Sequence, residues 1–315
     1  MAFRIKYMEF IIGVFCVALI LTACGQNGSA HKGNGQTEQD ITVTDAMGKV
    51  TIPNNPRRVL APNMEDSLVA LGVTPAAQWS IGTTVHDYLQ PYLKGVPKIE
   101  WDLPLEQTIK ANPDLIIFSS AASIKKGQYE KYKKIAPTYV FKDAESADWR
   151  KQLQVMGQLL GKEEKAKEAL ADYDAKVKKA RADIKAAIGD ESAAILWVFG
   201  KQYYLFENTR YAANVLYHDL GVAQPDMVKK LPKAETNWSP VSLEALADLD
   251  ADHIFLVSRP NEAGLEQLKQ SSVWKSILAV KKGNVYEMED PSHWTINGLV
   301  ASKLTMDKIM ESLTK

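Results

Sequence analysis

Short hydrophobic runs alternate with helical stretches along most of the chain. A hairpin-like opening covers residues 43–52, and short strands are predicted at 57–61, 76–81, 114–119 and 138–141. Asn63 is predicted to cap a helix over residues 64–71. Further strands are predicted at 193–199, 202–206, 253–257 and 284–288, with a helix at 211–220 and a terminal helix from about Ile296. Strands alternating with helices favour parallel sheets covered on both faces.

Residues 149–188 carry no strand signal and fit two helices that are broken near Gly161. In the second, apolar residues recur every three or four positions, at Leu170, Tyr173, Val177, Ala180, Ile184 and Ile188. A helix over residues 162–188 would be about 40 Å long. We predict a rigid connector between two lobes. A coiled-coil segment is the alternative, but the stripe is too short to favour it.

Two segments on opposite sides of this connector resemble each other. Leu105-Glu106 and Leu243-Glu244 are each followed, eight residues after the glutamate, by an aspartate that opens a core strand. A helix ends in Leu-Gly-Val in both halves, at residues 71–73 and 220–222. These repeats favour two related lobes with a cleft between them. The predicted boundaries are an N-terminal lobe at 41–148, linker helices at 149–189 and a C-terminal lobe at 190–315.

The N-terminus predicts the compartment. Two basic residues precede an apolar run at 10–23, which as a helix covers about 21 Å, short of the ~30 Å hydrocarbon core. Residues 1–23 are therefore interpreted as a signal peptide. The run ends in Leu21-Thr22-Ala23-Cys24-Gly25, which resembles a bacterial lipobox and implies cleavage before Cys24 and diacylation of its thiol; an ordinary signal peptide is the alternative. Polar residues 24–40 are predicted to form a flexible tether, on the extracytoplasmic face of the cell membrane.

Composition narrows the class of protein. The 315 residues contain 38 basic and 38 acidic side chains and are 46% hydrophobic, which excludes collagen-like, wholly disordered and polytopic membrane classes. Without a net positive charge or a Lys/Arg block, nucleic-acid binding is not expected. Cys16 lies in the signal peptide, so Cys24 alone would remain and no internal disulfide is predicted.

The sequence lacks the motifs of the common enzyme and metal sites. No G-x-S-x-G elbow, Walker loop or H-E-x-x-H pair is present. The histidines are scattered, at His31, His86, His218, His253 and His293. We therefore predict no catalytic residues, no cofactor and no metal ligands, and a binding protein rather than an enzyme. A direct metal-ion receptor and an extracellular enzyme are the less favoured alternatives.

Several motifs in a fixed order carry a family resemblance. They are the lipobox, the polar tether, Val50-Thr51-Ile52-Pro53, Pro56-Arg57-Arg58-Val59, Leu105-Glu106 before Asn112-Pro113-Asp114, Ser272-Val273-Trp274 and Gly283-Asn284-Val285-Tyr286. In this order the chain resembles the ferric-siderophore solute-binding lipoproteins of ABC importers, over nearly all of residues 15–315. The resemblance implies two Rossmann-like lobes joined by one long α-helix, with the ligand in the cleft. It also implies a monomer that delivers a ferric siderophore to a permease dimer with a cytoplasmic ATPase.

The resemblance assigns a docking role to one glutamate on each lobe. Family members dock these glutamates onto arginines of the permease, and the matching positions here are Glu106 and Glu244. The alternative is that both simply complement a helix N-terminus, which is worth ~0.3–1 kcal/mol.

Candidate ligand-binding residues follow from where strands end. In open α/β lobes, binding groups lie on loops beyond the carboxyl ends of the strands. This rule and the search for flat apolar walls select Asn63, Met64, Thr83, Thr84, Ser119, Tyr204, Trp238, Arg259 and Trp294, with Lys201 as a further candidate. The family resemblance adds Arg210. Trp197 is interpreted as core, and only one of Tyr203 and Tyr204 is expected to reach the cleft.

The sequence predicts the class of protein more closely than it predicts the chemical type of the chelate. A ferric hydroxamate is favoured because the candidate residues include few cations, and ferric citrate or a catecholate follows. Arginine suits the oxygen-rich faces of such chelates, because its planar fork can donate two hydrogen bonds. A haem receptor, with Met64 and His293 as possible iron ligands, and a cobalamin receptor of the same fold are the alternatives.

Overall fold

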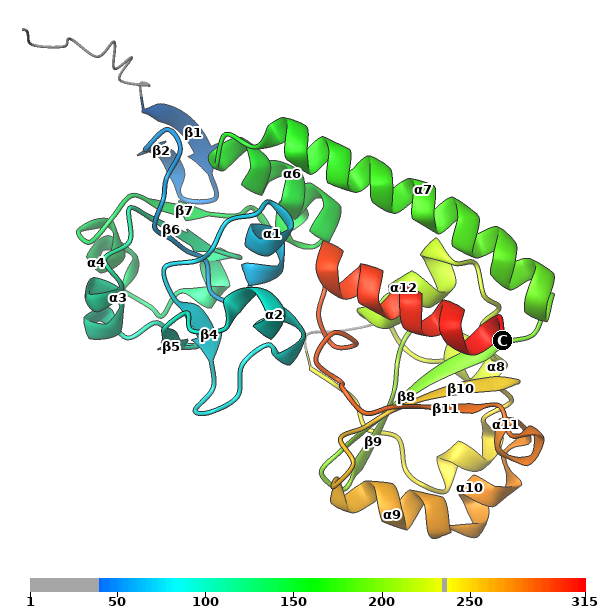
Figure 1. Cartoon of the computed structure of the whole chain (residues 1–315). Helices are drawn as coiled ribbons and strands as arrows, with labels where there is room; N and C mark the ends of the chain where they lie inside the picture. The colour runs from blue at the N-terminus through cyan, green and yellow to red at the C-terminus, as the bar shows by residue number, and fades with distance from the viewer. Residues whose placement is uncertain (1–39, 234–236) are drawn as a thin grey trace, which may run out of the picture. The chain divides into compact units, whose positions relative to one another are not determined.

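The chain forms two lobes that are connected by a long helix (Figure 1). The computed structural model describes residues 40–233 and 237–315, which form one unit. The predicted signal peptide, Cys24, His31 and nearly all of the predicted tether lie outside the described residues. No sheet of the described residues spans both lobes. The fold class predicted from the sequence is confirmed.

The N-terminal lobe is built on a hairpin and two small parallel sheets. The hairpin pairs β1 (Ile41–Asp45) with β2 (Gly48–Ile52), as predicted. The first sheet has the order β3-β6-β7, and the second pairs β4 with β5. These strands are β3 (Val59–Leu60), β4 (Gln78–Ser80), β5 (Lys98–Glu100), β6 (Leu115–Phe118) and β7 (Thr138–Val140). Sequence analysis missed β5, because only its central residue is buried.

Short helices connect these strands. They are α1 (Glu65–Ala70), η1 (Asp87–Leu89), α2 (Gln90–Leu93), α3 (Leu105–Ala111), η2 (Ala121–Ser123), α4 (Tyr129–Lys133) and α5 (Asp143–Ser146). The prediction that Asn63 caps the first helix is wrong. The N-cap position is Met64, and it makes no side-chain cap hydrogen bond. Asn63 instead adopts a left-handed conformation, with φ of 62°, which asparagine tolerates better than most residues.

Two helices form the predicted connector. α6 (Trp149–Leu159) and α7 (Glu163–Ile188) are separated at Gly161, whose φ is 61°. The predicted apolar stripe of α7 lies inward, with Leu170, Tyr173, Ala180 and Ile184 buried. At 1.5 Å per residue the 26 residues of α7 cover about 39 Å, and Figure 1 shows α7 running past both lobes. The predicted helical connector is therefore confirmed.

The C-terminal lobe contains one four-stranded sheet of order β11-β10-β8-β9. Its strands are β8 (Ala193–Phe199), β9 (Gln202–Leu205), β10 (His253–Val257) and β11 (Val285–Met288). β10 runs parallel to β8 and β11, but β9 runs antiparallel to β8. This sheet is therefore mixed, because Gly200, with φ of 61°, turns the chain directly back between β8 and β9.

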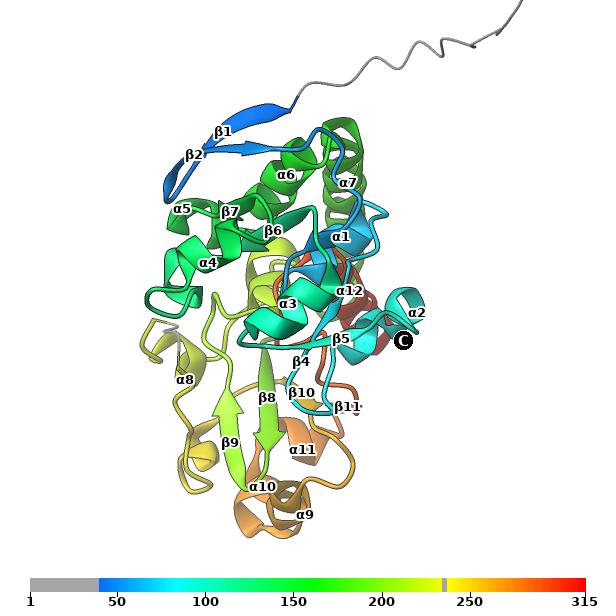
Figure 2. The ribbon, with the colours of Figure 1, turned by 90° about the vertical axis from the view of Figure 1, so that its left-hand side faces the viewer.

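The helices of the C-terminal lobe surround this sheet (Figure 2). They are the π-helix η3 (Asn214–Asp219), α8 (Asp226–Lys229), η4 (Ala245–Asp248), α9 (Ala263–Gln270), α10 (Ser272–Ser276), α11 (Leu278–Lys282) and α12 (Leu299–Leu313). The terminal helix thus begins three residues later than predicted. The repeated Leu-Glu segments are similar but unequal, because α3 begins at Leu105 whereas the 3-10 turn η4 begins just after Glu244.

A buried aspartate joins α1 of the first lobe to α12 of the second. The Asp66 carboxylate accepts hydrogen bonds from the backbone N–H groups of Val300 (3.0 Å) and Ala301 (2.9 Å) and from the Tyr88 hydroxyl (3.0 Å). It therefore caps the α12 N-terminus from another element, where a negative charge is favoured. Gly298 packs so closely against this carboxylate that a Cβ atom there would overlap it.

Candidate functional site

The loops beyond the strand ends carry the predicted ligand-binding residues of the first lobe. Asn63 and Met64 follow β3, Thr83 and Thr84 follow β4, and Ser119 follows β6. Asn63, Thr83 and Thr84 are exposed, and Ser119 is half-buried. Met64 is buried in the main core. The exposed members of this set therefore present hydroxyl and amide groups rather than charges.

In the second lobe two of the predicted aromatic residues, Tyr204 and Trp238, lie together in a larger aromatic group. The ring centroids of Trp197, Tyr204, Phe206 and Tyr211 lie 4.8–5.9 Å from that of Trp238. We call these five residues the Trp238 cluster. Aromatic pairs at such distances stabilise one another beyond the area they bury. Tyr204 and Phe206 are buried, so the accessible apolar surface of the cluster comes from the half-buried Trp197, Tyr211 and Trp238.

The two neighbouring tyrosines of β9 separate as expected for adjacent strand residues. Tyr204 belongs to the Trp238 cluster, whereas the Tyr203 hydroxyl donates to the Gly264 carbonyl (3.2 Å). Trp197, which sequence reasoning assigned to the core, is only half-buried and also belongs to the cluster. Trp294 is fully buried and packs against Phe255 at 5.6 Å between ring centroids.

Arg210 lies against the Trp238 cluster but carries its own counter-charge. Its guanidinium carbon is 4.3 Å from the Trp238 ring centroid, a cation–π distance. Its Nε and Nη2 donate to the two oxygens of Glu207, with Nη2 to Oε1 at 2.8 Å. Both side chains are buried. Because a buried charge must be paired, Glu207 neutralises Arg210 where the ligand is predicted to bind.

Arg259, two residues beyond β10, is also paired. Its Nη2 lies 2.8 Å from Oδ2 of Asp87 in the first lobe, and both side chains are about half exposed, at 53% and 48%. The two residues are 172 positions apart. A cavity of about 470 Å³ is lined by Asp87, Arg259, Pro260, Asn261, Glu262, Glu289, Asp290 and Pro291. Both arginine candidates are thus neutralised by acids that sequence reasoning did not select.

Of the two acidic partners, Glu207 could have been found from its spacing in the sequence, whereas Asp87 could not. Glu207 precedes Arg210 by three residues, a spacing at which side chains on a helical turn meet. Asp87 could not be linked to Arg259 without knowing how the two lobes approach each other. The neighbouring backbone contact, from the Tyr88 N–H to Ser292 Oγ (3.1 Å), is equally remote in sequence.

A buried acid lies behind the loop that carries Thr83 and Thr84. The Glu65 Oε1 atom accepts from the Trp79 N–H (2.7 Å), and Oε2 has no hydrogen-bond partner among the described residues. His86 Nε2 is 3.8 Å from Oε2, and its ring stacks on Trp79 at 4.6 Å. Burial raises the pKa of Glu65 to about 7 and lowers the pKa of His86 to about 4.

A further buried histidine lies in the loop that precedes α12. His293 bonds Thr305 Oγ1 (2.9 Å), and burial lowers its pKa to about 4. Like Met64, it is buried rather than exposed. Over residues 40–233 and 237–315, no three His, Cys, Asp or Glu side chains are grouped to hold a metal ion.

The two predicted docking glutamates are both on the surface. Glu106 lies in the first turn of α3, and Glu244 directly precedes η4. Both side chains are exposed, and neither carboxylate has a hydrogen-bond or ion-pair partner within the described part of the chain. This geometry leaves them accessible to a partner protein.

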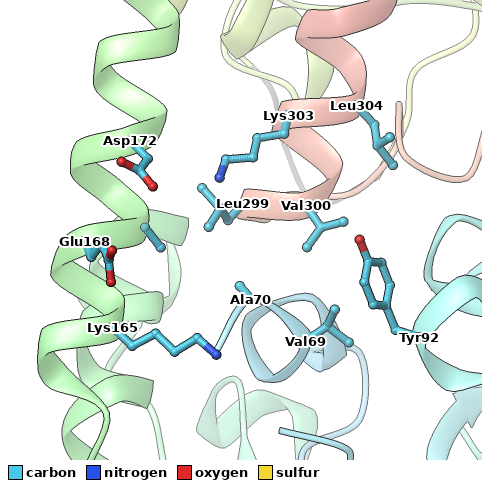
Figure 3. Close-up of a pocket in the computed structure, with 11 residues that line it drawn as sticks. Val69, Ala70, Tyr92, Lys165, Glu168, Asp172, Leu299, Val300, Lys303 and Leu304 are labelled. Carbon is cyan, nitrogen blue, oxygen red and sulfur yellow. The ribbon is translucent and has the colours of Figure 1, made fainter. Parts of the chain in front are cut away.

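A second cavity lies on the connector side of the molecule (Figure 3). It has a volume of about 380 Å³ and is lined by residues of α1, α7 and α12 together with Tyr92 of α2. Figure 3 shows Lys303 reaching from α12 toward α7, where Glu168 and Asp172 lie. No strand end contributes to its lining, so it does not fit the position rule for ligands of open α/β sheets.

The described helices were compared with the requirements of a membrane span. None of those within 40–233 and 237–315 combines the length and apolar character that a membrane span requires. α7 is long enough, but it is rich in charged residues.

Two α/β lobes, a long helical connector and candidate binding residues at strand ends define a two-lobed solute-binding protein. Comparison with known families agrees, since residues 59–291 match the family described as "Periplasmic binding protein". The match covers more than half of the chain, and the chain belongs to this family.

Individual relatives are named for iron complexes. The chain is 33% identical to the "Iron(3+)-hydroxamate-binding protein FhuD" of Bacillus subtilis, over 98% of this chain and 99% of that protein. It is 28% identical to the "Probable siderophore-binding lipoprotein YfiY" of the same species, over 96% and 97%. These names confirm the family resemblance predicted from motif order.

Solved structures agree with the fold. A Bacillus subtilis protein of the FhuD fold family, titled as a component of a Fep/Fec-like ferrichrome ABC transporter, superposes with a TM-score of 0.73 at 30% identity, covering 87% of this chain and 100% of that one. Staphylococcus aureus SirA complexed with staphyloferrin B gives 0.71 at 27% identity, covering 87% and 98%. One fold thus holds proteins whose titles name different chelates.

Proposed function

We propose that the chain is the lipid-anchored substrate-binding protein of an ABC importer and that it binds a ferric siderophore. The observation that carries this proposal is the end-to-end similarity, at 33% identity, to a protein named for binding iron(III) hydroxamates. Cys24 supplies the lipid anchor at the extracytoplasmic face of the membrane. The protein acts as a monomer.

Recognition in this proposal involves no covalent change. The siderophore already encloses its iron, so the protein contributes neither metal ligands nor a cofactor and is not an enzyme. The Trp238 cluster provides an apolar wall, and Asn63, Thr83, Thr84 and Ser119 provide hydrogen-bonding groups on the opposite lobe. Such a mixture of apolar walls and a few polar groups is typical of small-molecule sites.

Charge favours a hydroxamate over a catecholate or citrate. A ferric trihydroxamate core has no net charge, whereas ferric catecholates are strongly anionic. Arg210 and Arg259 would be natural partners of an anionic ligand, but Glu207 and Asp87 already neutralise them. Among the cationic candidates, the exposed Lys201 alone has no ion-pair partner within the described residues, so the candidate site offers little uncompensated positive charge to an anionic chelate.

The protein delivers its ligand by docking to the permease dimer. The cytoplasmic ATPase then drives transport through that permease. Glu106 and Glu244 supply one exposed negative charge on each lobe. Complementary charges on the permease would steer and orient the encounter.

Intrinsic tryptophan quenching tests the proposal. The protein is titrated with a ferric trihydroxamate, ferric citrate, a ferric catecholate, haem and cobalamin, and with the iron-free hydroxamate as a control. The proposal expects saturable quenching that is strongest with the ferric trihydroxamate, and an intact siderophore by mass spectrometry afterwards. Absence of saturable binding to every ferric siderophore would overturn it.

A further inference from the structure

The Asp87–Arg259 ion pair connects the two lobes at the strand-end rim. Asp87 opens η1 at the end of the loop that follows β4, and Arg259 lies just beyond β10. The cavity that the pair lines is also lined by three more acidic residues, Glu262, Glu289 and Asp290. Arg259 is the one basic side chain among the described lining residues.

Both members of the pair extend from backbone that is held in place. The residues flanking Asp87 are His86, stacked on Trp79, and Tyr88, whose N–H donates to Ser292. The Arg259 carbonyl accepts from Ser258 Oγ (3.0 Å) and from the Glu262 N–H (3.2 Å). These contacts therefore fix the backbone on both sides of the ion pair, although the two side chains are half exposed.

The pair contributes little to stability, but it occupies one of the guanidinium donors that an anionic ligand would use. Ion pairs with this exposure contribute little to folding stability, because water screens them. An anionic ligand oxygen at this guanidinium must nevertheless compete with the Asp87 carboxylate and approach three further carboxylates. A neutral chelate does not depend on that competition. The carboxylates around Arg259 would thus repel an anionic chelate, and this repulsion would discriminate between anionic and neutral chelates together with the attractive contacts.

We propose that Asp87 is a specificity-determining residue that disfavours anionic ferric chelates by occupying Arg259 at the rim of the cleft. This inference rests on the proposed function, because it assigns a role within the same binding site. It predicts that releasing Arg259 from Asp87 changes which charge class of chelate the protein accepts.

The test compares two substitutions that remove the same charge from the same cavity. Asp87→Asn releases Arg259, whereas Glu289→Gln leaves the ion pair intact, since no interaction of the Glu289 side chain with another described residue holds it. Both positions are exposed, so both variants should fold, and circular dichroism checks this. Affinities for ferric citrate and for a neutral ferric trihydroxamate are measured for each.

The expected result is a gain confined to one variant and one ligand. Asp87→Asn should bind ferric citrate about fivefold more tightly than the wild type, and Glu289→Gln less than about twofold more tightly, while trihydroxamate affinity changes less than about twofold in both. Adding Arg259→Gln to Asp87→Asn should abolish the gain. Equal gains in the two single variants, or a gain that survives the second substitution, would overturn the inference.

The design separates this inference from the proposed function. If the wild type binds no ferric chelate, the proposed function fails and the specificity role fails with it. If the wild type binds the trihydroxamate but Asp87→Asn leaves the preference unchanged, the specificity role alone is refuted.

Discussion

Replacing Glu65 by glutamine should stabilise the protein at neutral and alkaline pH. The Glu65 side chain is buried, and its Oε2 has no hydrogen-bond partner within the described ranges. The groups around it are His86, Asp66 and Tyr88, and none supplies a positive charge at neutral pH, because burial lowers the pKa of His86 to about 4. Glutamine keeps an oxygen that can accept from the Trp79 N–H.

The magnitude follows from the pKa of Glu65, which burial raises from 4.5 to about 7. A group whose pKa is raised on folding contributes stability below its unfolded value, and this contribution is lost as the pH rises through the folded value. At about 1.4 kcal/mol per pKa unit, ionising Glu65 in the folded protein costs about 3 kcal/mol. The variant lacks this cost, so its advantage should develop between about pH 5 and pH 8.

His86 does not create this difference. Its lowered pKa gives stability that is present above pH 6.5 and is lost as the pH falls toward about 4, and the variant retains it. Asp66, whose pKa burial also raises, is likewise common to both proteins.

Urea denaturation at a series of pH values measures the effect. The free energy of unfolding of Glu65→Gln should exceed that of the wild type by about 3 kcal/mol at pH 8.5, with the advantage shrinking by most of that amount at pH 5. Glu106→Gln, at an exposed glutamate, is the matched control and should show no such pH dependence. A difference between Glu65→Gln and wild type that stays constant with pH would refute the reasoning.

Three further outcomes are expected. Reversing the charge of both docking glutamates, Glu106→Arg with Glu244→Arg, should abolish siderophore uptake by cells while leaving ligand affinity intact; a loss of affinity would contradict the docking role. Asp66→Ala leaves two α12 N–H groups and the Tyr88 hydroxyl without their acceptor and should lower the free energy of unfolding by about 3 kcal/mol, measured by denaturation. Trp238→Ala should weaken ferric trihydroxamate binding by about tenfold, measured by calorimetry, and unchanged affinity would remove the Trp238 cluster from the site.

The sequence predicted those helices and strands whose hydrophobic residues recur at regular spacing. The α7 stripe, the break at Gly161 and most core strands follow from spacing over a few residues, and the structure has them. β5 was missed because a strand with one buried residue has no hydrophobic run. The antiparallel course of β9 was missed because its apolar residues do not encode strand direction.

The loops that carry the candidate residues were predictable from the sequence, but the ion pairs that these residues form were not. The hydrophobic runs mark where the strands end, and they therefore indicated the loops that carry Thr83 and Arg259. The neutralising partner of Arg259 depends on how the two lobes meet, which no local pattern contains. Burial of Met64 and Trp294 likewise depends on tertiary packing.

The most direct measurement of the central claim is a crystal structure of the protein with a ferric trihydroxamate, with iron located by its anomalous signal. The account predicts one iron position between the Trp238 cluster and the loop carrying Thr83 and Thr84. An iron position in the cavity beside Lys165 and Lys303, or no bound iron at saturating chelate, would contradict it.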